Sequence, residues 1–275
     1  KNKIFLAPME EVNDPAFRML CKKAGAGLTY TPLSSPLNPK ELKLPDKPVL
    51  QIFGNKDILA KNSISLFFKK YNKKVKFWDF NLGCPSALAK KHGFGAYLED
   101  LVVIENILRT MKQNTKKPVT VKIRKSKIAY DILKIAEKYC EAIAIHPRTR
   151  AQGYSGEPDL DWAKQFKKKS KIPVIYSGNV DETNYKEFLK FFDYVMIGRA
   201  SIGHPEIFAK ISGNKKFKRS YKDYIKFAIK YNVPWKIMKF QAMQFTKGLE
   251  GSRKKRVEIF KLKTVDELKN AINNL

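Results

Sequence analysis

The feature that most constrains how this chain folds is an alternation of short apolar runs, rich in β-branched and aromatic residues, with longer amphipathic segments. Eight such runs precede Gly213. The expected strands are Ile4–Ala7, Leu28–Thr31, Val49–Phe53, Phe77–Asn81, Val119–Arg124, Ala142–His146, Val174–Tyr176 and Tyr194–Ile197. Continuous apolar strands are typical of a parallel sheet that is covered on both faces.

Helical patterns lie between these runs. The expected helices are Pro15–Lys23, Asp57–Tyr71, Leu101–Lys112, Ala129–Lys138, Leu160–Lys168 and Glu182–Phe191, with a short element near Pro39–Leu42 and an eighth helix from His204-Pro205. Eight strand-then-helix units predict an α/β protein with a (β/α)8 TIM barrel. The alternative is a doubly wound sheet, which normally carries a GxGxxG turn after its first strand. The segment Ala7-Pro8-Met9-Glu10 is not such a turn.

The pattern changes after Gly213. Residues 214–219 form a basic linker, and helical stretches follow near Tyr221–Tyr231, Trp235–Lys247 and Thr264–Asn273. Gly248 and Gly251 mark a turn. We therefore divide the chain into a catalytic barrel, residues 1–213, and a small basic helical domain, residues 214–275. The densest basic cluster of this domain is Arg253, Lys254, Lys255 and Arg256.

The charge of the chain points to a polyanionic partner. Lys and Arg number 55 against 26 Asp and Glu, which gives a net charge of +29. Such an excess attracts nucleic acid, although a Lys/Asn/Ile-rich proteome that favours surface lysine would give the same composition. No basic amphipathic helix with a bulky apolar face is evident, and no apolar run approaches the ~18 residues that span a bilayer. We expect nucleic acid and no membrane.

The three cysteines give no disulfide framework, because their number is odd and no CxxC pair occurs. The first residues reach Pro8 too soon for a signal peptide. We therefore expect a reducing, cytoplasmic location, and we expect a monomer. Cys21 and Cys140 fall within helical patterns and are interpreted as buried small hydrophobes.

Cys84 differs from the other two cysteines. It lies in the turn Asn81-Leu82-Gly83-Cys84-Pro85, directly after an apolar strand. A thiol held in a turn at a strand end faces a cleft, whereas a core cysteine lies within a strand or helix. The position favours a reactive thiol over a structural one.

Catalytic residues of a (β/α)8 barrel lie at the carboxyl ends of its strands. Polar or conformationally special residues occur there strand after strand, which core packing alone does not explain. They are Pro8 and Met9, Gln51, Asn81 and Cys84, Lys122 and Arg124, His146 with Arg148 and Arg150, Ser177-Gly178-Asn179, and Gly198-Arg199.

The last two of these turns predict a phosphate site. Small-residue turns after the seventh and eighth strands commonly bind phosphate on backbone N–H groups. Ser177-Gly178-Asn179 and Gly198-Arg199 occupy those places, and Arg199 adds a charge for the same anion.

Lys122 lies inside a strand, where an unpaired ammonium is costly to bury. An electron-rich cofactor explains it, because a flavin needs a cation near its N1–C2=O edge. Gln51 and Asn81 are amides suited to the polar edge of the ring. His146 is a general acid or a donor to phosphate or substrate, unless it is a satisfied core residue. His92, His146 and His204 lack ligand-like spacing, so we expect no metal.

At this point the chain resembles the tRNA-dihydrouridine synthases. The most specific blocks are Asn81-Leu82-Gly83-Cys84-Pro85-Ser86 and the run from His146 to Gly156. Further matches are Ala7-Pro8-Met9 with Asp14 and Phe17-Arg18, Gln51–Gly54, Gly93–Ala96, Val121–Arg124, Asp161-Trp162, Val195–Ala200 and Lys247-Gly248-Leu249. The match covers residue 4 to about 212, and more loosely the remainder.

The resemblance implies an enzyme that uses FMN and NADPH to reduce the C5=C6 bond of particular uridines in tRNA. Cys84 would protonate C5, Asn81 would border flavin and base, and Arg148 and Arg150 would bind RNA at the mouth of the pocket. Arg124 and the tail residues Arg253, Lys254, Lys255 and Arg256 are further candidates for tRNA contact. The FMN-binding residues would be Pro8, Met9, Gln51, Lys122, His146, Gly178, Gly198 and Arg199, with Ser177 and Asn179 beside them.

Some positions depart from the family pattern. Glu11 stands where a glycine is usual, so we expect a differently shaped first turn. Ser177 and Asn179 replace the Asn and Asp of the usual Asn-Gly-Asp, and the segment after Arg124 is shortened. These differences affect substrate positioning more than chemistry.

Two other functions are consistent with parts of the sequence. One is an FMN barrel that acts on a small molecule, similar to dihydroorotate dehydrogenase, but the net charge and the basic tail argue against it. The other is a non-catalytic RNA-binding protein, which would not need Cys84, Gln51 and Lys122 in one cleft.

Overall fold

The computed structural model describes residues 2–39 and 41–272. Its parallel strands are β1 (Ile4–Leu6), β2 (Leu28–Thr29), β3 (Val49–Ile52), β4 (Phe77–Leu82), β5 (Val119–Arg124), β6 (Ala142–His146), β7 (Val174–Ser177) and β8 (Tyr194–Ile197). They pair in the order β2-β1-β8-β7-β6-β5-β4-β3. Parallel bridges from Tyr30 to Val49 and from Ser34 to Ile52 join the two end strands. The strands therefore form a nearly closed barrel, and the predicted (β/α)8 fold is confirmed.

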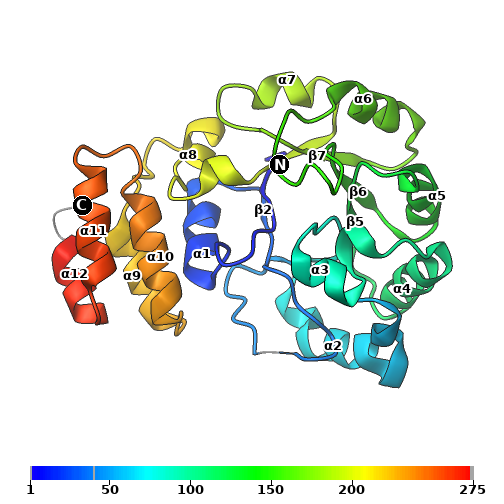
Figure 1. Ribbon diagram of the computed structural model, residues 1–275, viewed down its shortest axis with the longest axis horizontal. Helices are drawn as coiled ribbons and strands as arrows, with labels where there is room; N and C mark the ends of the chain where they lie inside the picture. The colour runs from blue at the N-terminus through cyan, green and yellow to red at the C-terminus, as the bar shows by residue number, and fades with distance from the viewer. Residues whose placement is uncertain (1, 40, 273–275) are drawn as a thin grey trace.

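Helices surround the barrel and continue into the tail (Figure 1). Around the barrel lie α1 (Pro15–Ala24), α2 (Ser63–Tyr71), α3 (Ala87–His92), α4 (Leu101–Gln113), α5 (Ala129–Tyr139), α6 (Leu160–Lys169), α7 (Tyr185–Leu189) and α8 (Ile207–Ser212). The tail holds α9 (Tyr221–Lys230), α10 (Trp235–Phe245), α11 (Ser252–Lys261) and α12 (Val265–Ile272). The described residues also form short 3-10 helices: η1 (Lys56–Asn62), η2 (Asn72–Lys74), η3 (Gly95–Tyr97) and η4 (Arg199–Ser201).

Strand alternation separates two environments. On β4, Trp78 and Phe80 belong to the main hydrophobic core, where Trp78 stacks on Phe68 of α2 with ring centroids 3.7 Å apart. Asp79 and Asn81 take the opposite face, toward the barrel interior. A small apolar cluster, which includes Phe5 and Met196, also occupies the interior. The polar interior residues toward the strand ends then form the site.

Two helix predictions need correction. We expected one helix over Asp57–Tyr71, but the chain forms η1 and then α2, because Lys61 and Asn62 both have left-handed backbones with φ of 51° and 55°. We expected a helix over Glu182–Phe191, but α7 is limited to Tyr185–Leu189. There the Asp181 carboxylate accepts the backbone N–H groups of Thr183 and Asn184 and holds a turn instead.

Other elements were missed or do not form. The sequence patterns did not predict α3, which Ser86 caps, or α11, which contains the basic cluster. No helix or strand forms at residue 39 or at 41–42, and residue 40 lies outside the described residues. The predicted end of the last helix, Asn273, also lies outside them. Cys21 is buried within α1, whereas Cys140 is buried directly after α5, as its C-terminal capping residue.

The tail helices lie together beside α1 and α8, on one side of the barrel (Figure 1). Gly203, in the segment after β8, is part of this contact. Its φ is +78°, and a Cβ there would lie 2.2 Å from the Gln244 carbonyl oxygen of α10. Only glycine fits this position, so the tail packs directly on the segment that follows the last strand.

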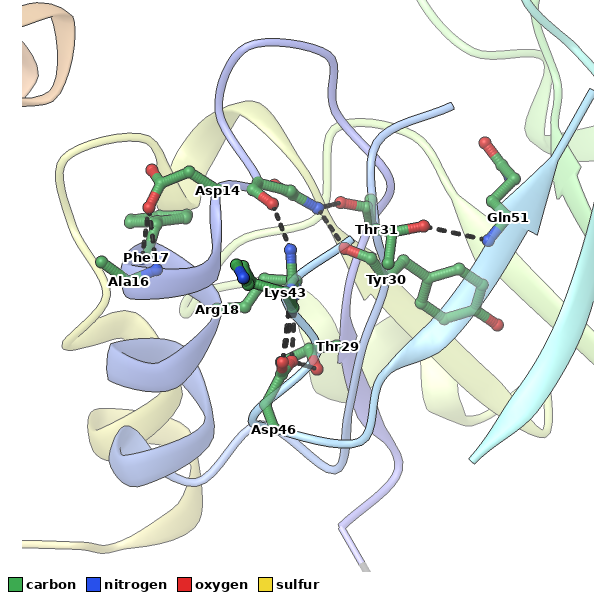
Figure 2. Close-up of polar contacts among 12 residues, drawn as sticks. Asp14, Ala16, Phe17, Arg18, Thr29, Tyr30, Thr31, Lys43, Asp46 and Gln51 are labelled. Carbon is green, nitrogen blue, oxygen red and sulfur yellow. Dashed lines mark hydrogen bonds and ion pairs between the residues drawn. The ribbon is translucent and has the colours of Figure 1, made fainter. Parts of the chain in front are cut away.

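The segment between β2 and β3 is fixed to α1 by buried polar contacts, drawn in Figure 2. Arg18 of α1 donates to the Asp46 carboxylate at 3.1 Å and to the Lys43 carbonyl oxygen at 2.8 Å. The Thr29 hydroxyl donates to the same carboxylate. Further along, Thr31 Oγ1 accepts the backbone N–H of Gln51 at 3.1 Å. These contacts hold β3 in place, and with it the Gln51 side chain.

Candidate active site

A cavity of about 900 Å³ opens at the carboxyl ends of the strands. It is lined by every barrel residue that the sequence pattern singled out for the site except Arg150. These residues are Pro8, Met9, Gln51, Asn81, Cys84, Lys122, Arg124, His146, Arg148, Ser177, Gly178, Asn179, Gly198 and Arg199. Residues from different strand ends thus meet in one cavity.

Cys84 lies partly exposed in the turn after β4. The backbone N–H groups of Gly83 and Cys84 donate to Asn81 Oδ1 at 3.1 and 2.9 Å, so Asn81 closes the turn. The thiol lies 3.3 Å from the Ser86 hydroxyl. Gly95 packs against the turn with φ of +61°, where a Cβ would lie 2.8 Å from the Cys84 carbonyl oxygen. The turn is therefore held from both sides.

A chain of buried hydrogen bonds runs beneath this turn. Asn81 Nδ2 donates to Gln51 Oε1 at 2.9 Å, and Gln51 Nε2 donates to Asp79 Oδ2 at 2.6 Å. Thr120 Oγ1 donates to the other oxygen of Asp79 at 2.5 Å. Burial raises the pKa of Asp79 to about 6, although these hydrogen bonds and the charge of Lys122 oppose the shift. Gln51 and Asn81 are therefore hydrogen-bonded to each other in the absence of a ligand.

Lys122 places a cation in the cavity. Burial, and then repulsion from Arg124, lower the pKa of Lys122 to about 8, while electrostatic interactions with Asp79 and Cys84 oppose this. Among the described residues, its ammonium group has no hydrogen-bond partner. The cation is thus free to meet an electron-rich ligand.

Two arginines meet at Asn179 in the cavity lining. Asn179 Oδ1 accepts hydrogen bonds from Arg199 at 2.8 Å and from Arg148 at 3.1 Å. Asn179 has φ of +49°, and its side-chain amide donates to Glu157. Gly178 and Gly198 line the cavity beside these side chains. Two guanidinium groups and two small-residue turns suit a phosphate group.

His146 is held neutral here. Burial, and then Lys122, Arg124, Arg148 and Arg199, lower its pKa to about 2. Arg148 Nη1 lies 3.1 Å from His146 Nε2. Because a guanidinium only donates, Nε2 must accept, and the ring proton must lie on Nδ1. A neutral imidazole in this tautomer offers one N–H to a ligand but no acidic proton.

The arginines proposed for RNA take different places. Arg148 is only 1% exposed and donates to the Gly156 carbonyl oxygen at 2.6 Å, so it lies in the cavity wall and not at its mouth. Arg124 is also buried and braces the Cys84 turn through the Gly83 carbonyl oxygen at 2.8 Å. Arg150 lies outside the lining, where it pairs with Glu99 at 2.8 Å.

The four basic residues of the tail cluster lie on α11, away from the cavity lining. Arg253, Lys254 and Arg256 are exposed, and Lys255 is half-buried. Nothing in these positions tests an RNA contact, which stays a prediction.

Sequence reasoning missed two residues that line the cavity, Tyr154 and Glu157, and one buried residue beneath the lining, Asp79. Tyr154 lines the cavity, is 58% exposed, and lies 5.2 Å from the Arg124 guanidinium and 5.4 Å from that of Arg199. Its presence between His146 and Gly156 was a usable signal. Asp79 gave a second signal, because it is a carboxylate inside an apolar strand.

Neither a metal centre nor a membrane span is present in the part of the chain that the structure describes. No group of three or more His, Cys, Asp or Glu side chains within residues 2–39 and 41–272 could hold a metal ion. No helix within the same residues has the length and apolar character needed to cross a membrane.

Fold and cavity together define a (β/α)8 barrel enzyme with its site at the carboxyl ends of the strands. Solved structures share the fold. A histamine dehydrogenase from Rhizobium sp. 4-9 superposes with a TM-score of 0.54 at 12% identity, over 84% of this chain and 49% of its own. A mandelate oxidase gives a TM-score of 0.51 at 14% identity, over 77% and 69% of the two chains.

The chain belongs to the dihydrouridine synthase family. The family model "Dihydrouridine synthase (Dus)" matches residues 5–275. The tRNA-dihydrouridine synthase B of Pasteurella multocida is 32% identical over 231 residues, which cover 76% of this chain and 68% of that protein. A probable tRNA-dihydrouridine synthase of Aquifex aeolicus is 29% identical, over 98% of this chain and 94% of its own.

Proposed function

We propose that this protein reduces the C5=C6 bond of particular uridines in tRNA, with FMN as cofactor and NADPH as reductant. The observation that carries the proposal is the content of one cavity: a thiol at Cys84, a cation at Lys122, and an arginine-rich end at Asn179. The family supplies the reaction, and the names of the relatives supply tRNA as the substrate class.

The residues present fit FMN. Arg199, Arg148 and the turns at Gly178 and Gly198 would hold its phosphate, and the N–H at Nδ1 of His146 is a further donor. Lys122 needs an electron-rich partner, which the N1–C2=O edge of a flavin provides. When bound, the reduced flavin supplies the hydride for C6.

Cys84 would then complete the reduction. A hydride added at C6 leaves carbanion character at C5, which a positioned acid must neutralise. Cys84 is the partly exposed thiol of this cavity, and its turn is held by Asn81 and Gly95. We assign the proton donated to C5 to Cys84 Sγ. Held neutral by burial and by its cationic neighbours, His146 serves as a hydrogen-bond donor and not as the acid.

The surroundings of the cavity suit a base drawn out of folded RNA. Proteins read unstacked bases by stacking them on aromatic and guanidinium groups. Tyr154 is exposed in the cavity and lies beside Arg124 and Arg199. The net charge of +29 attracts the phosphate backbone. We assign Tyr154 to the target base, and Arg150 with the α11 cluster to the surrounding RNA.

The decisive experiment is reconstitution. Purified protein should be yellow, release FMN on denaturation, and form dihydrouridine in tRNA when NADPH is supplied. Mass mapping of tRNA from cells that lack the protein identifies the uridine. Release of FAD, no flavin binding after reconstitution, or turnover of free pyrimidines with none of tRNA would refute the proposal.

A further inference from the structure

Asp79 is a buried carboxylate to which the proposed reaction assigns no role. It lies on β4 with 0% exposure, and it belongs neither to the lining of the cavity nor to an ion pair among the described residues. A carboxyl group is costly to bury unless hydrogen bonds compensate for its loss of contact with water. Its two partners are Gln51 and Thr120.

The hydrogen bonds that connect Asp79 to the Cys84 turn all run in one direction, from donor to acceptor. At one end, the backbone N–H groups of Gly83 and Cys84 only donate, so Asn81 must present its oxygen to them. Asn81 Nδ2 then donates to Gln51 Oε1, which leaves Gln51 Nε2 pointing to Asp79. At this other end an ionised carboxylate only accepts. Both ends therefore impose the same orientation on the two amides.

This direction matters to the reacting groups. Gln51 and Asn81 both line the cavity. Beyond the hydrogen bonds already described, Gln51 keeps one N–H and one lone pair, and Asn81 keeps one N–H. If the Gln51 amide could rotate, its donor and acceptor would exchange places toward the ligand. Asn81 would then lose its partner, and the N–H groups of the Cys84 turn would lose a fixed acceptor.

We propose that Asp79 is a positioning residue: through Gln51 and Asn81 its carboxylate fixes which ends of two amides face the cavity and holds the turn that carries Cys84. The importance of this turn to catalysis rests on the proposed function, but the orientation of the amides does not. Asp79 acts without touching the ligand.

Two variants separate this role from general stability. Asp79→Leu has no acceptor for Gln51. Asp79→Asn keeps one, because its oxygen can face Gln51 while its amide donates to the Thr120 hydroxyl. That hydroxyl can turn to the Trp78 carbonyl oxygen, which lies 3.3 Å away. The matched control is Asp46→Asn. Asp46 is a buried carboxylate that accepts hydrogen bonds from Arg18 and Thr29 and takes no part in the hydrogen bonds between Asp79 and the Cys84 turn.

The main readout is hydrogen exchange of the Gly83 and Cys84 amides in flavin-free protein. Asp79→Leu should exchange them roughly tenfold faster, since their acceptor is released, while Asp79→Asn and Asp46→Asn should stay within about threefold of wild type. The affinity for FMN should follow the same order. Wild-type protection in Asp79→Leu, or loss of protection in Asp79→Asn, would overturn the proposal.

A measurement on the wild-type protein covers the case in which Asp79→Leu and its replacement Asp79→Val do not fold. In isotope-labelled protein, the side-chain NH2 of Gln51 should show nuclear Overhauser contacts to Thr120 and slow solvent exchange. Contacts to Asn81 in their place, or exchange at the rate of a free amide, would refute the orientation. Because no flavin or tRNA is present, these results are independent of whether the protein proves to make dihydrouridine.

Discussion

Gln241, on the second helix of the tail, donates from Nε2 to the Val12 carbonyl oxygen in the first barrel turn at 2.7 Å. The same nitrogen lies 3.0 Å from the Asp14 carboxylate, which the Tyr224 hydroxyl of α9 also reaches at 3.2 Å. The tail thus contacts the turn that carries Pro8 and Met9. A basic tail that we assign to RNA is also part of what holds this side of the cavity.

Asp14 should make stability depend on pH. Burial raises its pKa to about 6, although backbone N–H groups of Phe17 and Ala16 and the charge of Arg18 oppose the shift. The stabilisation is fully present below the unfolded pKa and is lost as pH rises through about 6. Between pH 4.5 and 7.5, the wild type should lose about 2 kcal/mol relative to Asp14→Asn. Urea unfolding of both proteins measures this, and a pH-independent difference would contradict it.

Cys84→Ala should leave FMN bound and reducible by NADPH, yet abolish dihydrouridine formation, because the proton donor to C5 is gone. Single-turnover assays with tRNA measure the two half-reactions separately. Cys21→Ala and Cys140→Ala are the controls, since both cysteines are buried away from the cavity and should change stability alone. Turnover of Cys84→Ala at the wild-type rate would exclude the role.

Arg199→Ala should weaken FMN binding by roughly 10- to 100-fold, because it removes a charge-assisted hydrogen bond to phosphate. Riboflavin lacks the phosphate, so its affinity should hardly change. Fluorescence titration with both flavins gives the comparison. Arg150→Ala serves as the matched control, because Arg150 lies outside the cavity. An equal loss for both flavins would place Arg199 away from the phosphate.

Replacing Arg253, Lys254, Lys255 and Arg256 with glutamine should weaken tRNA binding and flatten its salt dependence. The slope of log affinity against log salt should fall by up to roughly 0.7–0.9 for each phosphate that the variant no longer neutralises. NADPH oxidation should be unaffected. The control variant replaces four lysines that precede β4 and β5, at the end of the barrel away from the cavity. They are Lys73, Lys74, Lys76 and Lys116. If both variants change the slope equally, the α11 cluster makes no specific contact.

Glu11→Gly should stabilise the protein by about 1 kcal/mol. Glu11 has φ of +59°, a left-handed backbone that costs an L-residue roughly 1–2 kcal/mol, partly offset by the flexibility of glycine in the unfolded chain. Glu11→Ala removes the same charge but keeps the strain, so it should give no gain. Chemical denaturation compares the three proteins, and equal stabilities for Gly and Ala would refute the argument.

The first turn contains a residue that departs from the family pattern, Glu11. A glutamate in place of the usual glycine suggested a differently shaped turn. In the structure Glu11 has the left-handed conformation that glycine favours, and so does Asn179 after the seventh strand. The nearby residues Val12 and Asp14 are held by the tail, which helps to keep this backbone in place.

By itself, the sequence determined the barrel and many of the residues that line its cavity. Eight apolar runs with polar residues at their ends suffice, because parallel strands in a closed barrel bring their carboxyl ends together. Gln51, Cys84, Lys122 and Arg199 could therefore be placed in one site from strand position alone.

Only the tertiary structure decided what those side chains do to one another. Burial and neighbouring cations keep His146 neutral. Arg148 is buried in the cavity wall. Hydrogen bonds through two side-chain amides connect Asp79 to the Cys84 turn. The order of the residues along the sequence does not predict these interactions. Desolvation and hydrogen-bond direction depend on distances between strands, and these exist only once the barrel has closed.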